Sequence, residues 1–234
     1  MIIECKNLMK VYQTEGKDFR AVDDVSMKVE KGEFVIILGH SGSGKTTLLS
    51  LIGGLARPDA GAVIIHGLDQ NRQAESELAE LRNRTIGFIF QFSSLIPTLT
   101  ALENVLLPLT FSKVPPSPGS YDQACTLLEQ VGLSGKEKSF PAQLSGGQQR
   151  RVAIARAFIN QPDIILADEP TGDLDEETEG EILRIFREKN QIAKTTFLVV
   201  THNGVLGKTQ HKPRTFMMKN GVLSENSSEV ASSI

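Results

Sequence analysis

This chain has only two cysteines, and they form no recognisable pair. Cys5 and Cys125 lie far apart and match no metal or redox motif, which excludes a disulfide scaffold and predicts two ordinary buried thiols in a reducing compartment. No apolar run approaches the roughly 18 residues of a membrane span, because Glu103 and Asn104 interrupt the most apolar stretch, 95–111. The start of the chain lacks the basic and apolar segments of a secretory signal. We therefore expect neither a membrane span nor a secretory signal.

Blocks of basic residues are absent as well. The formal net charge is -3, which argues against a nucleic-acid-binding surface. A chain of 234 residues can form one large domain, or a domain with a subdomain, around a sizeable core. These features are typical of a soluble α/β enzyme.

A glycine-rich segment, GHSGSGKT at residues 39–46, is the most informative feature that the sequence does contain. It fits the pattern G-x-x-x-x-G-K-[ST] and stands between a strand-like run, 34–38, and a helix-like run, 47–52. Backbone N–H groups of such a loop converge on phosphate oxygens, its lysine contacts the same phosphates and its final hydroxyl holds Mg²⁺. A flexible loop would explain the glycines but not their flanks. We expect a nucleoside triphosphatase whose phosphate-binding residues are Gly39, Ser41, Gly42, Ser43, Gly44, Lys45, Thr46 and Thr47.

Two adjacent carboxylates end a second apolar run, 164–167. In open α/β sheets the carboxyl ends of strands face the ligand crevice. Asp168 is expected to bind Mg²⁺, directly or through water, and Glu169 to orient and polarise the water that attacks the terminal phosphate. Alone, such a pair often serves only to solvate a loop. Together with a phosphate loop, it indicates catalysis.

The remaining pattern predicts strands and helices around a mainly helical stretch from 95 to 161. We expect two or three short strands within 1–30, separated by a polar turn at 12–17, and a frayed tail from Ser224. An exposed proline-rich loop, 115–119, is expected before a helix that Ser120 caps and Gly132 ends. Further strands are expected at 61–67, 86–90, 163–167 and 196–200. The last two are expected to share one parallel sheet with 34–38. A further helix is expected at 75–83.

Residues 144–151, LSGGQQRR, stand directly before a helical run that reaches Phe158. They resemble the signature motif of the ABC ATPases. Ser145 and the backbone amides of Gly146 and Gly147 would form a second anion site at a helix N-terminus. A serine-glycine turn with an N-cap would explain the start of the helix but not the partner motifs.

Four further segments resemble ABC motifs in the order that the family shows. Tyr12 resembles the aromatic residue that stacks on adenine, and Gln91 the glutamine that senses Mg²⁺ and the attacking water. Residues 172–175, with Asp175, resemble the D-loop, and His202 resembles the switch histidine that contacts the γ-phosphate. Singly, Tyr12 would be a surface aromatic, Gln91 a polar turn residue and His202 a satisfied strand-end histidine. The ordered set favours the family assignment.

The resemblance implies a P-loop NTPase of ABC type, with a mixed-sheet core, an N-terminal antiparallel β subdomain and an inserted helical subdomain. The core would comprise 1–90 and 162–223, the helical subdomain 91–161 and a flexible tail 224–234. The implied ligands are ATP and Mg²⁺, the latter held by Thr46, Gln91 and Asp168. The implied partners are a second copy, in a head-to-tail dimer that encloses two ATP molecules, and an integral-membrane transporter subunit at the cytoplasmic side of the inner membrane; no nucleic acid is expected.

Within the family, segments 87–91, 95–105 and 167–172 resemble the ATPases of lipoprotein-releasing and macrolide-export systems. An amino-acid importer or cell-division ATPase, and a soluble ABC protein acting on DNA or ribosomes, are the alternatives. The departures from the family pattern are His40 where proline is common, Arg150 in place of a frequent glutamine, the added carboxylate of Asp173, and an irregular stretch at 203–214.

An apolar strip beside Gln91 is expected to receive a short cytoplasmic helix of the membrane subunit. The alternative is that these side chains belong to the core of the helical subdomain. The strip consists of Phe90, Phe92, Leu95, Ile96, Leu99 and Leu102.

Overall fold

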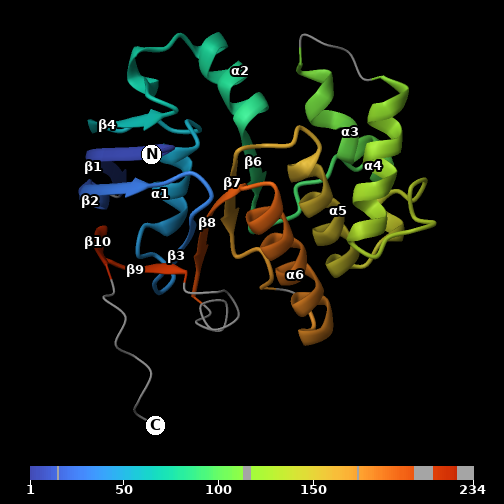
Figure 1. The fold of residues 1–234 in the computed structure, drawn as a ribbon. Helices are drawn as coiled ribbons and strands as arrows, with labels where there is room; N and C mark the ends of the chain where they lie inside the picture. The colour runs from blue at the N-terminus through green and yellow to red at the C-terminus, as the bar shows by residue number, and fades with distance from the viewer. Residues whose placement is uncertain (15, 113–116, 173, 203–212, 226–234) are drawn as a thin grey trace. The chain divides into compact units, whose positions relative to one another are not determined.

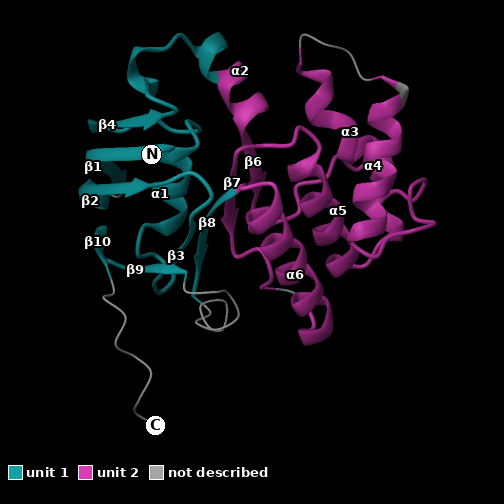
Figure 2. Cartoon of the chain, viewed as in Figure 1, with its two compact units in different colours: residues 1–78, 196–234 teal, residues 79–195 magenta. Residues whose placement is uncertain are grey.

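The computed structural model describes residues 1–14, 16–112, 117–172, 174–202 and 213–225 (Figure 1). The chain forms two compact units, Met1–Leu78 with Thr196–Ile234, and Ala79–Thr195 (Figure 2). The three-part division expected from the family resemblance stays a prediction. Asp173 and the greater part of the irregular stretch, 203–212, lie outside the described residues.

An antiparallel sheet in the first unit has the strand order β2-β1-β4-β5. Its strands are β1 (Ile3–Thr14), β2 (Lys17–Val29), β4 (Ala60–Ile65) and β5 (Leu68–Asp69). The predicted strands within 1–30 and their connection within 12–17 are confirmed, but the strands are longer and the turn shorter than predicted, because β1 and β2 form one long hairpin in which Tyr12 pairs with Phe19 and Thr14 with Lys17. The polar residues near its tip lie in exposed strand, where polarity does not indicate a turn.

A second group of strands in the first unit contains the strand that precedes the phosphate loop. It comprises β3 (Phe34–Leu38), β8 (Thr196–Thr201), β9 (Arg214–Lys219) and β10 (Val222–Glu225). Strand β3 pairs in parallel with β8 and β9, as predicted for β8, and the rings of Phe34 and Phe197 stack with centroids 5.0 Å apart. The tail was expected to fray from Ser224, but Ser224 and Glu225 pair with Met217 and Phe216 in the β9–β10 ladder; residues 226–234 of the predicted tail lie outside the described residues.

Helix α1 (Lys45–Ile52) follows the phosphate loop and packs against β1, β2 and β8. Leu48, Leu51 and Ile52 are fully buried, so that the apolar run predicted as a buried helix is confirmed. A short 3-10 helix, η1 (Gln70–Arg72), follows β5. Helix α2 (Glu75–Thr85) connects to β6 and matches the predicted helix at 75–83.

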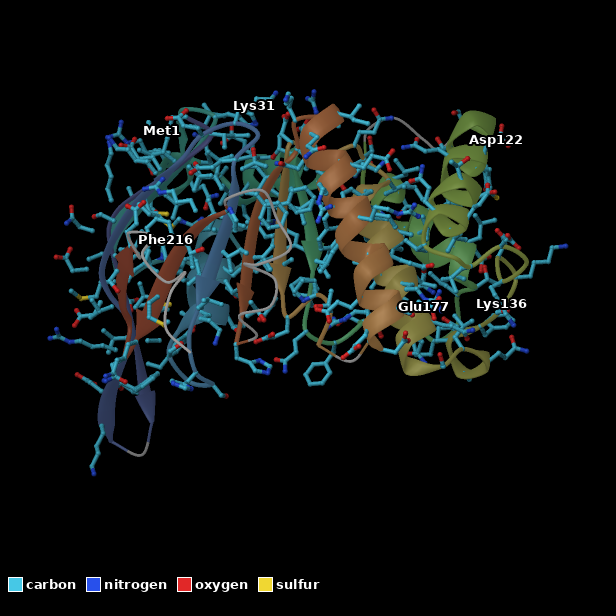
Figure 3. All side chains as sticks on the ribbon, turned by 60° about the horizontal axis from the view of Figure 1, so that its bottom comes forward. Met1, Lys31, Asp122, Lys136, Glu177 and Phe216 are labelled. Atoms are coloured by element: carbon cyan, nitrogen blue, oxygen red, sulfur yellow. The ribbon has the colours of Figure 1, made fainter. Side chains whose placement is uncertain are left out.

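The second unit contains a parallel pair of strands and most of the helices. Strand β6 (Ile86–Ile89) pairs with β7 (Ile164–Asp168), and both lie within two residues of the predicted strands. The helices are α3 (Ala101–Thr110), α4 (Pro118–Gln130), η2 (Pro141–Gln143), α5 (Gly146–Phe158) and α6 (Glu176–Ile192). Helices α3, α4 and α5 pack against one another. Asp122 of α4 and Glu177 of α6 are exposed polar residues (Figure 3).

Helix α3 begins where two polar residues interrupt the most apolar stretch of the sequence. Thr100 and Glu103 form a capping box, in which the Thr100 N–H donates to Glu103 Oε2 at 2.7 Å. Asn104 is fully buried, and its side chain bonds to the backbone of Ile96, Leu99 and Thr100. Glu103 and Asn104, which interrupt the apolar stretch, thus hold the backbone of the segment before α3 in place.

Helix α4 begins three residues earlier than predicted, since the expected N-cap was Ser120. Its N-cap is Ser117, and Pro118 occupies the first helical position, where a fixed φ and a missing N–H are tolerated. The Ser117 N–H donates to Ser120 Oγ at 3.1 Å, so Ser120 completes the cap from within the helix. Gly132, at φ +69°, ends the helix as predicted. Residues 115 and 116 of the predicted loop lie outside the described residues.

The two cysteines differ in exposure. Cys5 is 2% exposed, whereas Cys125 is exposed, which corrects the expectation of two buried thiols. The core face of α4 consists of Ala124, Leu127, Leu128 and Val131, and position 125 lies off that face. Burial, assisted by the charge of Glu4, raises the pKa of the Cys5 thiol to about 12.

We predict that a thiol reagent at pH 8 labels Cys125 in the native protein and leaves Cys5 unmodified. With a pKa of about 12, only about one Cys5 in 10⁴ is ionised at that pH, and its sulfur is inaccessible. Peptide mass spectrometry after iodoacetamide treatment measures both sites, with a urea-unfolded sample as the control in which both react. Labelling of native Cys5 at the rate seen for Cys125 would contradict the structure.

Candidate nucleotide-binding site

The glycine-rich loop between β3 and α1 is held tightly against its neighbours in the first unit. A Cβ at Gly39 would lie 2.4 Å from the carbonyl oxygen of Met218, and one at Gly44 would lie 1.9 Å from that of Ala21. Gly42 and Gly44 have φ values of +78° and +104°, which glycine adopts without strain. The glycines therefore allow a tight loop, whose backbone N–H groups are the phosphate donors that the motif predicts.

The charged and polar groups of this loop fit an anionic ligand. The Lys45 ammonium donates to the carbonyl oxygens of Gly39 at 2.6 Å and His40 at 3.0 Å, and the residue is only 7% exposed. Ser43 Oγ is buried and has no hydrogen-bond partner among the described residues. Helix α1 has Gly44 as its N-cap and no acidic residue in its first turn. An anion at this helix N-terminus would meet favourable dipoles and no negative side chain on that turn.

We predict that Gly44→Ala destabilises the protein by about 3 to 4 kcal/mol, because a side chain there adds a clash to an unfavourable φ. Gly42→Ala is the matched control, since a Cβ there meets no atom within 4 Å. It should cost only the conformational strain of about 1 to 2 kcal/mol. Urea unfolding of both variants measures the difference. Equal losses would contradict the close approach of β2 to the loop.

Tyr12 and His202, the other predicted site residues of the first unit, lie on the long hairpin and after β8. Tyr12 is 42% exposed, and the Lys10 ammonium lies 5.6 Å from the centroid of its ring. His202 is exposed and follows Thr201, which pairs with Leu38 at the end of β3. The structure thus brings His202 and the start of the phosphate loop to one edge of the β3–β8 pair.

In the second unit, three predicted residues come together at the carboxyl ends of β6 and β7. The last paired residues are Ile89 and Ala167, after which the chains continue to Gln91 and to Asp168 and Glu169. Gln91 is exposed, Asp168 is 4% exposed and Glu169 is half-buried. Glu169 has φ +46°, a left-handed conformation that is uncommon outside glycine.

The predicted magnesium ligands are distributed over both units. Thr46 is exposed in the first turn of α1, in the first unit, and Gln91 and Asp168 belong to the second. Their side chains supply hydroxyl, amide and carboxylate oxygens, the donor set that suits Mg²⁺. Among the described residues, no group of three histidine, cysteine, aspartate or glutamate side chains forms a metal cluster. The donor chemistry of the three predicted ligands fits Mg²⁺.

The signature segment forms the N-terminus of α5. Ser145 is the N-cap, and its hydroxyl accepts from the Gln148 N–H at 3.2 Å, while Gln148 Oε1 accepts from the Ser145 N–H at 3.0 Å. A Cβ at Gly146 would meet no atom within 4 Å, and one at Gly147 would approach only Leu174. The simpler explanation of the sequence, that Ser145 caps a helix, therefore describes a cap that is present. The two glycines leave the N-terminus of α5 accessible.

Asp175 is the N-cap of α6, a role that the sequence reading missed. It accepts from the Thr178 N–H at 3.0 Å and from the Thr178 hydroxyl at 2.8 Å. These bonds hold the pKa of the Asp175 carboxyl below its ordinary value. The available signal was an aspartate three residues before a threonine at the start of an amphipathic run.

Arg150 and Arg156 on α5 bond to the backbone near Gln91, and Arg150 also bonds to that of Glu169. The sequence did not predict these contacts. Arg150, only 3% exposed, donates to the backbone carbonyls of Phe90 and Glu169. Arg156 donates to the carbonyls of Ser93 and Ser94, both at 2.9 Å, and its burial lowers its pKa. The sequence gives no signal for these contacts, because the partners are backbone atoms of distant segments.

The apolar strip beside Gln91 is part of the second unit and is accessible. Phe92 is 77% exposed, with Phe90 and Ile96 also exposed, and Leu95, Leu99 and Leu102 are half-buried. None of the six is buried, so the strip is not simply core. Among the helices of the described residues, none has the length and apolar character to cross a membrane.

Comparison with known proteins defines the class to which the fold and these motifs belong. The profile of the ABC transporter family matches residues 22–172. The chain therefore belongs to the ABC transporter family, as an ATP-binding subunit and ATPase with the ABC cassette fold, including the antiparallel β subdomain and the helical insertion. The predicted fold class and enzyme class are confirmed.

Two ATP-binding proteins are similar to this chain over most of its length. An uncharacterised ABC transporter ATP-binding protein of Thermotoga maritima is 50% identical over 202 residues, 86% of each chain. The lipoprotein-releasing system ATP-binding protein LolD of Idiomarina loihiensis is 42% identical over 222 residues, covering 95% of this chain and 96% of LolD. This chain is therefore similar to ATPases of the lipoprotein-releasing type.

Two solved structures of the cassette MJ0796, a bacterial ABC transporter cassette, are similar over nearly the whole chain. One is a dimer in a post-hydrolysis state bound to ADP and Pi, with 39% identity and a TM-score of 0.89. The other is also dimeric, with 40% identity and a TM-score of 0.90. Each match covers 96% of this chain and 98% of the other.

Proposed function

We propose that this ATPase binds Mg-ATP between two copies of the chain and drives a membrane subunit of the lipoprotein-releasing or macrolide-export type. The observation that carries nucleotide binding is the phosphate loop, where Lys45 lies over the loop backbone and Ser43 Oγ is buried without a partner. A polyphosphate would satisfy these groups and the N-terminus of α1 together. The similarity to LolD supports the transporter type.

The proposed nucleotide contacts follow the motifs. Residues 39–47 hold the phosphates, with Lys45 as the charged donor, and Tyr12 stacks on adenine. Thr46, Gln91 and Asp168 hold Mg²⁺ through oxygen atoms. When bound, the ion supplies positive charge that offsets the charge developing on the phosphates.

The proposed hydrolytic step uses Glu169 as the general base. Its carboxylate accepts a proton from water as the water oxygen bonds to the γ-phosphorus, and the bond from that phosphorus to the bridging oxygen breaks to release ADP. Gln91 orients the water, and His202 donates to a γ-phosphate oxygen. The exposed or half-buried positions of these three side chains leave them accessible to a ligand.

The second half of each site is proposed to come from the partner copy. Ser145, Gly146 and Gly147 at the N-terminus of α5 would contact the γ-phosphate held by the other chain, with Asp175 nearby in the D-loop. The open space at Gly146 and the dimeric cassettes of MJ0796 support this arrangement. ATP binding would then close the dimer and hydrolysis would reopen it.

The accessible apolar strip is the proposed docking surface for a short cytoplasmic helix of the membrane subunit. Phe90, Phe92 and Ile96 present exposed apolar area that a helix could bury. This partner would hold the chain at the cytoplasmic side of the inner membrane. No nucleic-acid partner is proposed, because the net charge is negative.

The test is to recover the membrane partner with tagged Glu169→Gln protein loaded with Mg-ATP, added to gently solubilised native membranes. Mass spectrometry should identify a subunit with four spans and a large extracytoplasmic domain. The same protein with the strip changed by Phe92→Asp should fail to recover it. A many-span permease with a solute-binding protein would assign the chain to an importer, and only soluble partners would contradict a transport function.

A further inference from the structure

The buried guanidinium of Arg150 connects two segments that carry proposed catalytic side chains. One guanidinium nitrogen donates to the carbonyl of Phe90, the residue before Gln91. The other donates at 2.5 Å to the carbonyl of Glu169 itself. All of these residues belong to the second unit. The planar side chain of Arg150 thus holds the backbone beside Gln91 and at Glu169, the two residues proposed to act on the attacking water.

The conformation of Glu169 explains why such a contact matters. Its φ of +46° is unfavourable for a residue with a side chain, and such conformations persist only where surrounding contacts hold them. The Glu169 carbonyl also accepts from the Gly172 N–H at 3.3 Å. Because the direction of the Glu169 side chain depends on this backbone, loosening the carbonyl would let the carboxylate move.

Helix α5 contacts the backbone on both sides of Gln91, before it and after it in the chain. Arg150 bonds to the residue before Gln91, and Arg156 bonds to the carbonyls of Ser93 and Ser94 beyond it. Ser94 also has a left-handed φ, +47°. Helix α5, which begins at Ser145, therefore holds the backbone around Gln91 and at Glu169.

We propose that Arg150 is a positioning residue for hydrolysis, which aligns Glu169 and Gln91 with each other through their backbones. The proposal rests on the roles assigned to these two residues in the proposed function. The two contacts of Arg150 that carry the proposal go to backbone carbonyls, which neither bind the phosphates nor accept the proton in the proposed step. Loss of Arg150 should therefore lower the rate of the chemical step and leave ATP affinity nearly unchanged.

The first test compares steady-state ATP hydrolysis by wild type, Arg150→Met, Arg150→Gln and Arg150→Lys. We expect kcat to fall by about 10- to 100-fold in Arg150→Met, with KM within about threefold, the scale seen when supporting contacts of a site are lost. Arg150→Lys keeps a charged donor for one carbonyl and should fall between Met and wild type. Nucleotide binding by each variant, measured by titration calorimetry, should stay within about threefold.

Gln123→Met is the matched control. Gln123 lies on α4 in the same unit and also donates to a backbone carbonyl, that of Ile159 at 2.9 Å, which adjoins no proposed catalytic side chain. Its kcat should stay within about twofold of wild type. Thermal unfolding shows the folded fraction of each variant, to which rates are normalised. A kcat for Arg150→Met within twofold of wild type, or the same loss in Gln123→Met, would overturn the proposal.

A double-mutant cycle with Glu169→Gln separates positioning from a general structural effect. If Arg150 acts through Glu169, Arg150→Met should reduce single-turnover hydrolysis far less in the Glu169→Gln background than in wild type. An equal reduction in both backgrounds would overturn the proposal. Full turnover by Glu169→Gln alone would instead reject the proposed base, whereas an impaired Glu169→Gln with an unimpaired Arg150→Met would reject positioning only.

Discussion

Glu169→Gln is expected to lower ATP turnover by roughly 10²- to 10⁴-fold, the range for loss of a general base, while ATP still binds. The amide has the size of the carboxylate but accepts no proton from water at neutral pH. Glu169 is half-buried directly after β7, and the Arg150 contact to its carbonyl does not involve its side chain. The variant should therefore fold normally and accumulate as the ATP-bound, closed dimer.

A coupled assay of ADP release measures turnover, and size-exclusion chromatography with Mg-ATP measures the dimer. Glu177→Gln is the control, because Glu177 is an exposed glutamate in the first turn of α6. It should hydrolyse ATP like wild type. Full turnover by Glu169→Gln would remove Glu169 from the role of base.

Ser145→Arg is expected to abolish steady-state hydrolysis, although each isolated chain still binds ATP. A long cation at the N-terminus of α5 would fill the space beside Gly146 that the partner's γ-phosphate needs. Ser145 lies outside residues 39–47, so the substitution leaves the phosphate-binding groups of the loop in the chain. The substitution should therefore abolish hydrolysis and leave nucleotide binding by the isolated chain intact.

Ser145 also caps α5, so the variant should lose about 1 kcal/mol of stability as well. Ser145→Ala controls for the lost cap, and Ser134→Arg, at an exposed position of the same unit, controls for the added charge. Thermal unfolding, a fluorescent-nucleotide titration and the hydrolysis assay are run on all three. Loss of ATP binding by isolated Ser145→Arg chains would contradict the proposed division between the two copies.

The parts of the fold that the sequence predicts best are those with a strong local cause. The strand at 34–38 and the helix after it follow from a β-branched apolar run, a glycine loop and a second apolar run. The core face of α4 follows from i, i+3, i+4, i+7 spacing, and its end from Gly132. In these places, local propensity and burial agree.

The predictions that were wrong or imprecise concern exposed segments, where polarity has several causes. The polar residues near Tyr12 indicated a longer turn, but they continue a hairpin whose strands pair as far as Thr14 and Lys17. The serines and prolines before α4 indicated a loop to 119, whereas Pro118 already occupies the first helical turn. Cys125 was expected to be buried because free cysteines usually are, but its helical position faces away from the core.

The contacts of Arg150 could not be predicted from local pattern. Its partners are carbonyl groups 60 and 19 residues away, and any residue type supplies a carbonyl. A charged residue in a helix is ordinarily exposed, whereas this one is almost fully buried. Only the tertiary structure identifies it as more than a departure from the family pattern.

The most direct test of the central claim, that each ATP site is built from two copies of the chain, mixes two inactive variants. Lys45→Ala lacks the phosphate-binding lysine, and Ser145→Arg lacks a usable signature. A mixed dimer would combine the intact phosphate loop of one with the intact signature of the other. An equimolar mixture should therefore recover about a quarter of the wild-type rate, since half the dimers are mixed and each holds one complete site. No recovery in mixtures whose mixed dimers are verified by differential tags would contradict the shared site.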